Sequence, residues 1–81
     1  MRIQMRYYSI LRDITRTPAE DYDLDDGATI GDSVTRAIAR HPLLANHHSA
    51  MLVARNSQYC AQGELLKEGD VVDIMPPVSG G

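Results

Sequence analysis

The chain has 81 residues, of which 43% are hydrophobic and 23% are charged, and its formal net charge is −3. This length predicts one domain with a small core, and the composition is that of a globular protein, which excludes the disordered and fibrous classes. A single lysine, Lys67, and the lack of a basic run argue against nucleic acid as a partner, and no apolar stretch approaches the roughly 20 residues of a membrane span. We therefore expect a cytoplasmic protein that binds neither nucleic acid nor a membrane.

The first 25 residues predict a hairpin of two strands. Residues 2–8 alternate between apolar and polar side chains, which is the period of a strand. Residues 11–21 contain a proline and many polar side chains, so they predict a turn or a short helical loop. A second short strand is expected over residues 20–25, where Tyr22 and Leu24 fall on the same face.

The next segment predicts an amphipathic helix, because one face has residues at helical spacing: Ile30, Val34, Ala37, Ile38 and His41. Thr29 is placed to cap the amino end of this helix, Asp32 lies in the first turn, and Pro42 ends the helix. Residues 43–50 fit no single element. The helix is therefore expected to follow the hairpin directly.

Three further strands are expected near the carboxyl end, over residues 51–55, 58–60 and 71–75. The order of strand, strand, helix and strands at this length predicts an α+β fold of the ubiquitin-like β-grasp type, with a mixed sheet of four to five strands around one main helix. A right-handed crossover would place the first and last strands side by side. Residues 1–75 would then form the domain, with the last strand central.

The last six residues, PPVSGG, predict an extended tail over residues 76–81. Pro76 and Pro77 cannot donate to a strand ladder, and they favour a projecting polyproline conformation. The residues after them can reach roughly 13 Å, and glycine lets the backbone pass a constriction that any Cβ would block. The α-carboxylate of Gly81 is ionised at neutral pH and is a poor electrophile, so chemistry there needs activation, for which adenylylation by ATP is suitable. A sulfur or amine nucleophile would then give a thiocarboxylate or an amide.

The cysteine, histidine and acidic side chains outside the tail do not indicate a separate functional site. Cys60 is the single cysteine of the sequence, so an internal disulfide is excluded. We expect Cys60 to be a half-buried strand residue. His41, His47 and His48 lack a recurring metal-ligand spacing, so we expect surface histidines and no metal. The pairs Glu20-Asp21 and Asp25-Asp26 are expected in solvated turns. No nucleophile triad or phosphate loop is present, so the chain should not catalyse a reaction alone.

Three stretches, MRIQMRYYSILRD, TIGDSVTRAI and LLKEGDVVDIMPPVSGG, resemble the small subunit of molybdopterin synthase, a β-grasp sulfur carrier. The resemblance implies that an E1-like adenylyltransferase uses ATP to activate the terminal glycine and that a sulfur donor protein converts it to a thiocarboxylate. The tail would then enter the large catalytic subunit, in a heterotetramer, and pass its sulfur to cyclic pyranopterin monophosphate. The chain itself would bind no cofactor.

By position, the resemblance implies that Gly81 is the sulfur carrier and that Gly80 gives it a slender approach. It also implies that a group of residues contacts the partner: Tyr8, Tyr59, Met75, Pro76, Pro77, Val78 and Ser79. The chain departs from the family in having Tyr7-Tyr8 where two phenylalanines are typical. A carrier for another thio-metabolite of the thiamine type and a ubiquitin-like protein modifier remain alternatives, because they share the terminal Gly-Gly.

Overall fold

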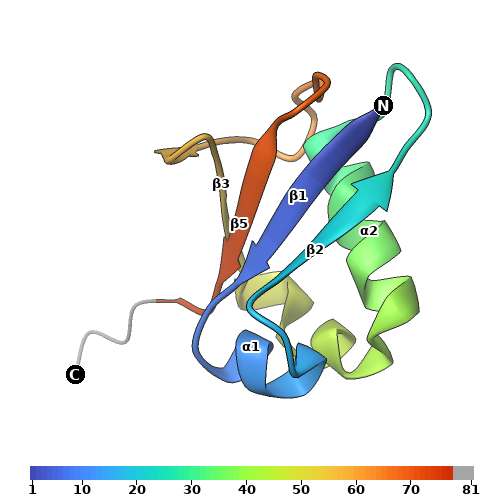
Figure 1. Cartoon of the computed structure of the whole chain (residues 1–81). Coiled ribbons are helices and arrows are strands. Elements are labelled where there is room, and N and C mark those ends of the chain that lie inside the picture. Colours follow the sequence, from blue (N-terminus) through green and yellow to red (C-terminus); the bar gives the residue numbers. More distant parts are fainter. Residues whose placement is uncertain (78–81) are drawn as a thin grey trace.

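The computed structural model of the protein describes residues 1–77, which form one sheet with helices on one side (Figure 1). The elements in chain order are β1 (Arg2–Tyr7), α1 (Ile10–Thr15), β2 (Ala19–Asp23), α2 (Ile30–Arg40), the 3₁₀ helix η1 (Pro42–Ala50), β3 (Leu52–Arg55), β4 (Gln58–Tyr59) and β5 (Val71–Met75). The sheet order is β2-β1-β5-β3-β4. No helix within residues 1–77 is both long and apolar enough to cross a membrane.

The pairing of the strands confirms the predicted topology. β1 and β2 pair antiparallel as a hairpin, and β5 pairs parallel with β1 and antiparallel with β3. The last strand is therefore central, with the first strand parallel beside it, as predicted. This mixed five-stranded sheet around α2 is the predicted α+β fold of the ubiquitin-like β-grasp type.

The helix α2 starts where its capping residues are. The Asp32 backbone N–H donates to Thr29 Oγ1 at 3.1 Å, and the Thr29 N–H donates to Asp32 Oδ2 at 2.8 Å. This reciprocal capping box satisfies two donors that the first turn leaves free. The helix ends at Arg40, one residue before the predicted end. Pro42 then begins η1, which occupies the segment that the sequence left ambiguous.

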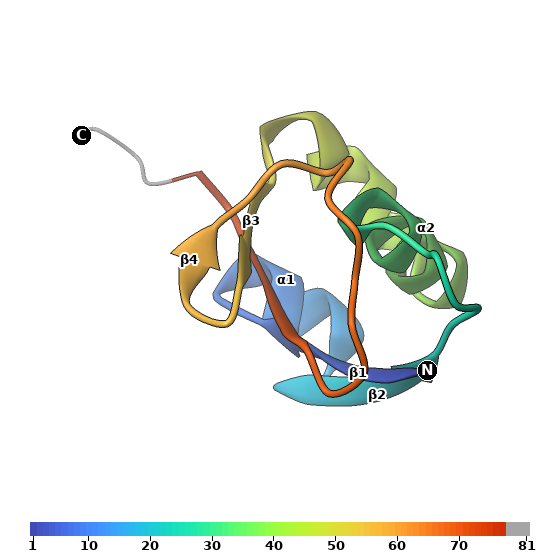
Figure 2. The same cartoon turned by 90° about the horizontal axis from the view of Figure 1, so that it is seen from above.

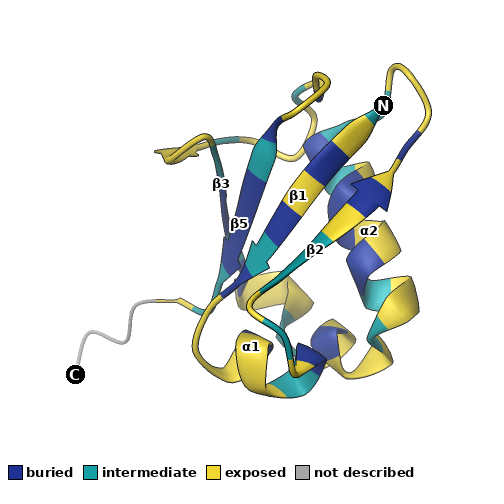
Figure 3. Cartoon of the chain, in the orientation of Figure 1, coloured by how far each residue is buried: buried dark blue, intermediate teal, exposed yellow. Residues whose placement is uncertain are grey.

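The core lies between the sheet and α2 (Figures 1 and 2). Its fully buried residues alternate along β1 and recur at helical spacing along α2, and the largest of them are Tyr7, Tyr22, Ile3, Met5, Leu11, Ile30, Leu44, Ile74, Val34 and Val72. Figure 3 shows buried and exposed positions alternating along β1, whereas β5 is buried at three successive residues. β5 thus has covered residues on both faces.

Most strands differ from the expected bounds by at most one residue at an end, and two segments differ by more. β2 runs from Ala19 to Asp23, and Leu24 lies just beyond it, although it is buried. The chain turns there through Gly27, whose φ of +89° favours glycine. Residues 11–21, expected as a turn or short helical loop, contain most of α1 and the first residues of β2, and Leu11 of α1 is buried in the core.

Candidate functional site

One face of the sheet has no helix of residues 1–77 over it (Figure 2). A row of directly paired residues crosses this face in sheet order: Ala19, Arg6, Asp73, Ala54 and Tyr59. Paired residues on neighbouring strands point to the same side, so all five point away from α2. We call this side of the sheet, with the adjoining Tyr8, Leu52 and Met75, the outer face.

The tail end of the outer face is apolar. Leu52 pairs with Met75, and the parallel register of Tyr7 with Ile74 brings the next residue, Tyr8, beside Met75. Tyr8 is 39% exposed, and the other two are half-buried. Tyr7, by contrast, is buried in the core. The predicted adjacency of the first and last strands thus brings Tyr8 and Met75 together outside the core.

Tyr59 adds a second aromatic side chain at the far edge of the outer face. It is 72% exposed and pairs with Ala54, which lies between β4 and the centre of the sheet. Tyr8, Met75 and Tyr59 therefore share one face, and their role in binding a partner stays a prediction. Leu52 and Ala54 were not predicted from the sequence, although their alternation with the core residue Val53 could have indicated this face.

The tail begins beside this apolar surface. β5 ends at Met75, Pro76 is half-buried, and Pro77 is exposed. In Figure 1 the chain leaves the sheet at the end where Tyr8 follows β1. The predicted tail residues Val78, Ser79, Gly80 and Gly81 lie outside the described part of the chain, so their roles, and the division at residue 75, stay predictions.

An ion pair lies in the middle of the outer face. Arg6 Nε donates to Asp73 Oδ1 at 2.6 Å, and Arg6 Nη2 donates to Asp73 Oδ2 at 3.0 Å. The hydrogen bond to Asp73 is the main reason why the pKa of Arg6 is raised. Asp73 is only 6% exposed, whereas the Arg6 side chain is 41% exposed. Arg6 thus covers the carboxylate and leaves its own outer edge in solvent.

A second polar cluster lies on the opposite side of the sheet and corrects two expectations. Glu20 is a half-buried residue of β2 and not part of a solvated turn, and His41 is not a surface histidine. Glu20 Oε1 accepts from the Tyr7 hydroxyl at 2.6 Å and from the Tyr22 hydroxyl at 3.0 Å, and it lies 2.7 Å from His41 Nε2. Arg40 stacks on the Tyr22 ring, 4.4 Å from its centroid. The sheet and the end of α2 are joined by these contacts.

The cluster changes the acidity of its members. Burial alone would raise the pKa of Glu20, but hydrogen bonds with Tyr7, His41 and Tyr22 outweigh it and lower that pKa. Burial, followed by the hydrogen bonds to Glu20 and Tyr22, raises the pKa of Tyr7. Glu20 is therefore a carboxylate held by donors, which is a structural arrangement and not that of a general acid.

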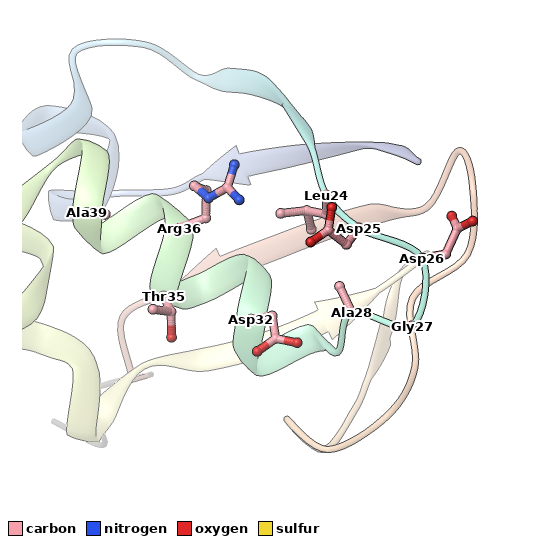
Figure 4. Close-up of a pocket in the computed structure, with 9 residues that line it drawn as sticks. All are labelled: Leu24, Asp25, Asp26, Gly27, Ala28, Asp32, Thr35, Arg36 and Ala39. Atoms are coloured by element: carbon pink, nitrogen blue, oxygen red, sulfur yellow. The ribbon is translucent and has the colours of Figure 1, made fainter.

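An open groove of about 450 Å³ lies between α2 and the turn before it (Figure 4). Its walls include Asp25 and Asp26, which are exposed as predicted, and Arg36. Asp32 already caps α2, and Arg36 Nη1 donates to the Asp23 carbonyl at 3.1 Å. The groove therefore shows solvated and internally paired groups and no recognisable site.

The remaining nucleophile and metal-binding side chains form no site in residues 1–77. Cys60 is half-buried as expected but lies just after β4 and not within a strand, and burial, then the nearby Glu64 carboxylate, raises the pKa of its thiol. His48 is exposed and His47 half-buried, and the described residues contain no group of three or more His, Cys, Asp or Glu side chains that could hold a metal. The outer face and the adjoining tail are thus the candidate site.

Comparison with known proteins agrees with the fold and with the resemblance described above. Residues 5–81 match the ThiS family. The chain is 35% identical to a molybdopterin synthase sulfur carrier subunit from Chlamydomonas reinhardtii and 28% identical to small archaeal modifier protein 1 from Haloferax volcanii, and the matches cover 100% and 98% of this chain and 100% of each relative. The crystal structure of SAMP1 from Haloferax volcanii superposes with a TM-score of 0.90 at 27% identity over 100% of both chains. This chain therefore belongs to the ThiS family, together with the molybdopterin synthase sulfur carrier subunits that it resembles over its whole length.

Proposed function

We propose that this protein is the sulfur carrier of a molybdopterin synthase and acts as its non-catalytic small subunit. The observation that supports this most is the position of the tail: Pro76 and Pro77 leave the sheet directly beside the apolar Tyr8, Met75 and Leu52. A partner protein that covers this surface would also contact the start of the tail at Pro76 and Pro77. The tail end would then be directed into the partner.

In this proposal the reacting group is the α-carboxylate of Gly81. An E1-like adenylyltransferase transfers AMP from ATP to that carboxylate and releases pyrophosphate. A sulfide-level sulfur from a donor protein then attacks the acyl carbon and displaces AMP, so one carboxylate oxygen is replaced by sulfur. ATP is used by the activating enzyme, and the chain itself holds no cofactor. Activation is required because the free carboxylate is a poor electrophile.

The thiocarboxylate would be delivered inside the large catalytic subunit, in a heterotetramer, to cyclic pyranopterin monophosphate. The outer face would supply docking through Tyr8, Met75 and Tyr59, and Val78 and Ser79 would line the entry of the tail. Aromatic and methionine side chains are frequent in such interfaces. Gly80 would pass the narrowest part, since a Cβ there would add width.

Intact mass spectrometry tests this reaction directly. The full chain is incubated with an E1-like adenylyltransferase, ATP and a sulfur donor, and the expected product differs by one oxygen replaced by sulfur. Omission of ATP is the control and should leave the mass unchanged. If the mass stays unchanged in the complete mixture, the sulfur-carrier proposal is wrong.

A matched variant separates threading of the tail from docking of the domain. Gly80→Val adds a β-branched side chain at the tip and leaves the outer face intact. We expect a complex with the large subunit that still forms but transfers sulfur about 10²-fold more slowly, as for a misplacement on the order of 1 Å. Transfer at the wild-type rate would contradict the narrow-channel part of the proposal.

The alternative function is that of a ubiquitin-like protein modifier, or of a carrier for another thio-metabolite of the thiamine type. The specific observation for the modifier is the similarity to small archaeal modifier protein 1. The same activated Gly81 would then be attacked by a lysine amine of a target protein. Conjugates of high mass in the incubation described above, with target proteins present, would support this alternative.

A further inference from the structure

The centre of the outer face contains a feature that an apolar docking surface does not need. Arg6 and Asp73 form a two-bonded ion pair there, with Ala54 on one side and Tyr8 and Met75 toward the tail. The two residues are 67 positions apart in the sequence and meet because β1 and β5 are neighbours. Arg6 and Asp73 lie two residues before Tyr8 and Met75 along the chain, so a partner that covers Tyr8, Met75 and Tyr59 together would lie next to this ion pair.

The stability of the free chain does not explain the pair well. The Arg6 side chain is 41% exposed and the Asp73 side chain is 9% exposed, so Arg6 satisfies a covered carboxylate while water partly screens the pair. Replacing such a pair by apolar residues of similar size is often neutral or stabilising. A contribution to partner binding is therefore a more specific reason for charges at this position.

The geometry leaves one edge of the guanidinium available. Nε and Nη2 of Arg6 donate to the two oxygens of Asp73, and Nη1 has no hydrogen-bond partner among residues 1–77. In the free chain, water can solvate Nη1. A partner that removes this water without an acceptor leaves a buried charged donor unsatisfied, which is costly.

We infer that the Arg6–Asp73 pair makes the outer face selective for a partner that places an oxygen acceptor, either a carboxylate or a carbonyl, opposite Arg6 Nη1. This inference rests on the proposed function, because it concerns the surface that docks onto the large subunit. A large subunit with an apolar side chain at that point is rejected, since docking would strip water from the guanidinium without replacing it. The pair thus sets partner choice, whereas the surrounding apolar residues supply contact area.

The test measures the affinity of the full chain for the large subunit of molybdopterin synthase from the same organism, by calorimetry. The variant Arg6→Leu/Asp73→Ala removes both charges, so that no carboxylate is left buried alone. We expect its affinity to fall roughly 10- to 100-fold, because the acceptor of the partner loses its donor. Because Asp73→Ala leaves a smaller side chain at a buried position, we expect the free variant to remain folded and to unfold cooperatively, with only a modest change in melting temperature.

A chemically matched control exists on the same strand. Arg2 Nε and Nη2 donate to the two oxygens of Asp23 at 3.0 and 3.3 Å, and both side chains are mostly exposed. Arg2 lies four residues from Arg6, roughly 13 Å along β1, away from the tail end of the face. The variant Arg2→Leu/Asp23→Ala should bind the large subunit with wild-type affinity.

The outcomes separate the inference from the proposed function. If the wild type and the Arg6→Leu/Asp73→Ala variant bind equally well and Tyr8→Glu binds weakly, the selectivity inference is overturned and the docking function stands. If the wild type does not bind, the proposed function fails and the inference fails with it. A steeper loss of affinity with salt for the wild type than for the double variant identifies the acceptor as a carboxylate, and equal slopes identify a carbonyl.

Discussion

The two faces of the sheet consist of the same strands, but the face toward α2 is buried and the outer face is partly exposed. The face toward α2 is closed by Ile3, Met5, Tyr7, Val72 and Ile74, each at most 2% exposed. The outer face leaves Tyr8 and Tyr59 in solvent and Met75 half-buried, with no helix of residues 1–77 over them. A single domain of this size needs only one closed face for its core. The apolar residues of the other face are thus available for a partner.

The polar groups of the two faces differ in how completely they are hydrogen-bonded within the chain. On the inner side, Glu20 is surrounded by donors from β1, β2 and the end of α2. On the outer face, the Arg6–Asp73 pair satisfies its carboxylate but keeps part of the guanidinium in water. The inner cluster is internally complete, as expected for a structural element, whereas the outer pair retains a free donor that a partner can use.

The largest expected effect is on the inner face. Ile74→Ala removes a fully buried side chain next to α2 and should lower the free energy of unfolding by about 2–5 kcal/mol. Urea denaturation measures this loss. Met75→Ala, one residue along the same strand but half-buried on the outer face, should cost clearly less. Equal losses would mean that the two faces contribute alike to the core.

The next effect concerns the inner polar cluster. Glu20→Gln removes a carboxylate that accepts hydrogen bonds from the Tyr7 and Tyr22 hydroxyls and lies beside His41 and Arg40. The substitution should lower the free energy of unfolding by about 1.5–3 kcal/mol at neutral pH. The pKa of Glu20 is lowered from 4.5, so its stabilisation is complete above pH 4.5 and is lost as the pH falls through the lowered pKa.

Denaturation at a series of pH values tests that sign. The difference in stability between the wild type and Glu20→Gln should shrink as the pH falls below 4.5. Asp25→Asn, which neutralises an exposed carboxylate, is the control and should leave stability nearly unchanged at every pH. A difference that stays constant down to strongly acidic pH would show that the charge of Glu20 is not what stabilises the cluster.

A smaller effect is expected for the outer face, and in binding only. Tyr8→Glu or Met75→Glu should weaken binding to the large subunit by more than about 1 kcal/mol, because each buries a charge in an apolar contact. Calorimetry measures the affinity, and the thermal melts of the free proteins should remain cooperative. Leu65→Glu is the matched control, since Leu65 is 61% exposed and pairs with Thr29 at the start of α2, away from the outer face. Unchanged affinity for both outer-face variants would place the interface elsewhere.

The smallest effect on stability is expected for the tail. Deletion of Gly81 should leave the melting temperature unchanged, because the core is formed within residues 3–74. The same deletion should abolish sulfur loading in the mass-spectrometric assay. A large drop in melting temperature would show that the tail packs as part of the domain.

Local patterns predicted most of the fold. The alternation in residues 2–8 and 71–75 predicted β1 and β5, and Thr29 and Asp32 predicted the start of α2. Bounds were less accurate where the chain turns: β2 ends before Leu24, because the turn through Gly27 starts there although Leu24 still faces the core. Periodicity reports which side chains are buried, and a buried residue need not lie in the strand.

The candidate site was predicted unevenly. Tyr8 and Met75 could be placed together because the crossover rule makes the first and last strands neighbours. Glu20 was wrongly expected in a solvated turn and His41 on the surface, since the hydrogen bond between them spans 21 positions and depends on how α2 ends above β2. The helical spacing that includes His41 and the alternation of Glu20 with Tyr22 place both residues on the core side, but no local pattern indicates that the two meet.

The sequence by itself determined β1, β5, the capped start of α2 and the proline-bounded end of β5, because these depend on residue types at short spacing, and three longer stretches carried the resemblance to the family. Only the tertiary structure decided which polar residues meet. Arg6 and Asp73 are 67 positions apart, and their contact depends on the parallel register of β1 with β5. A shift of that register by one residue would turn one of the two side chains to the other face. The sheet order and register, which are long-range properties, therefore determine what the outer face offers to a partner.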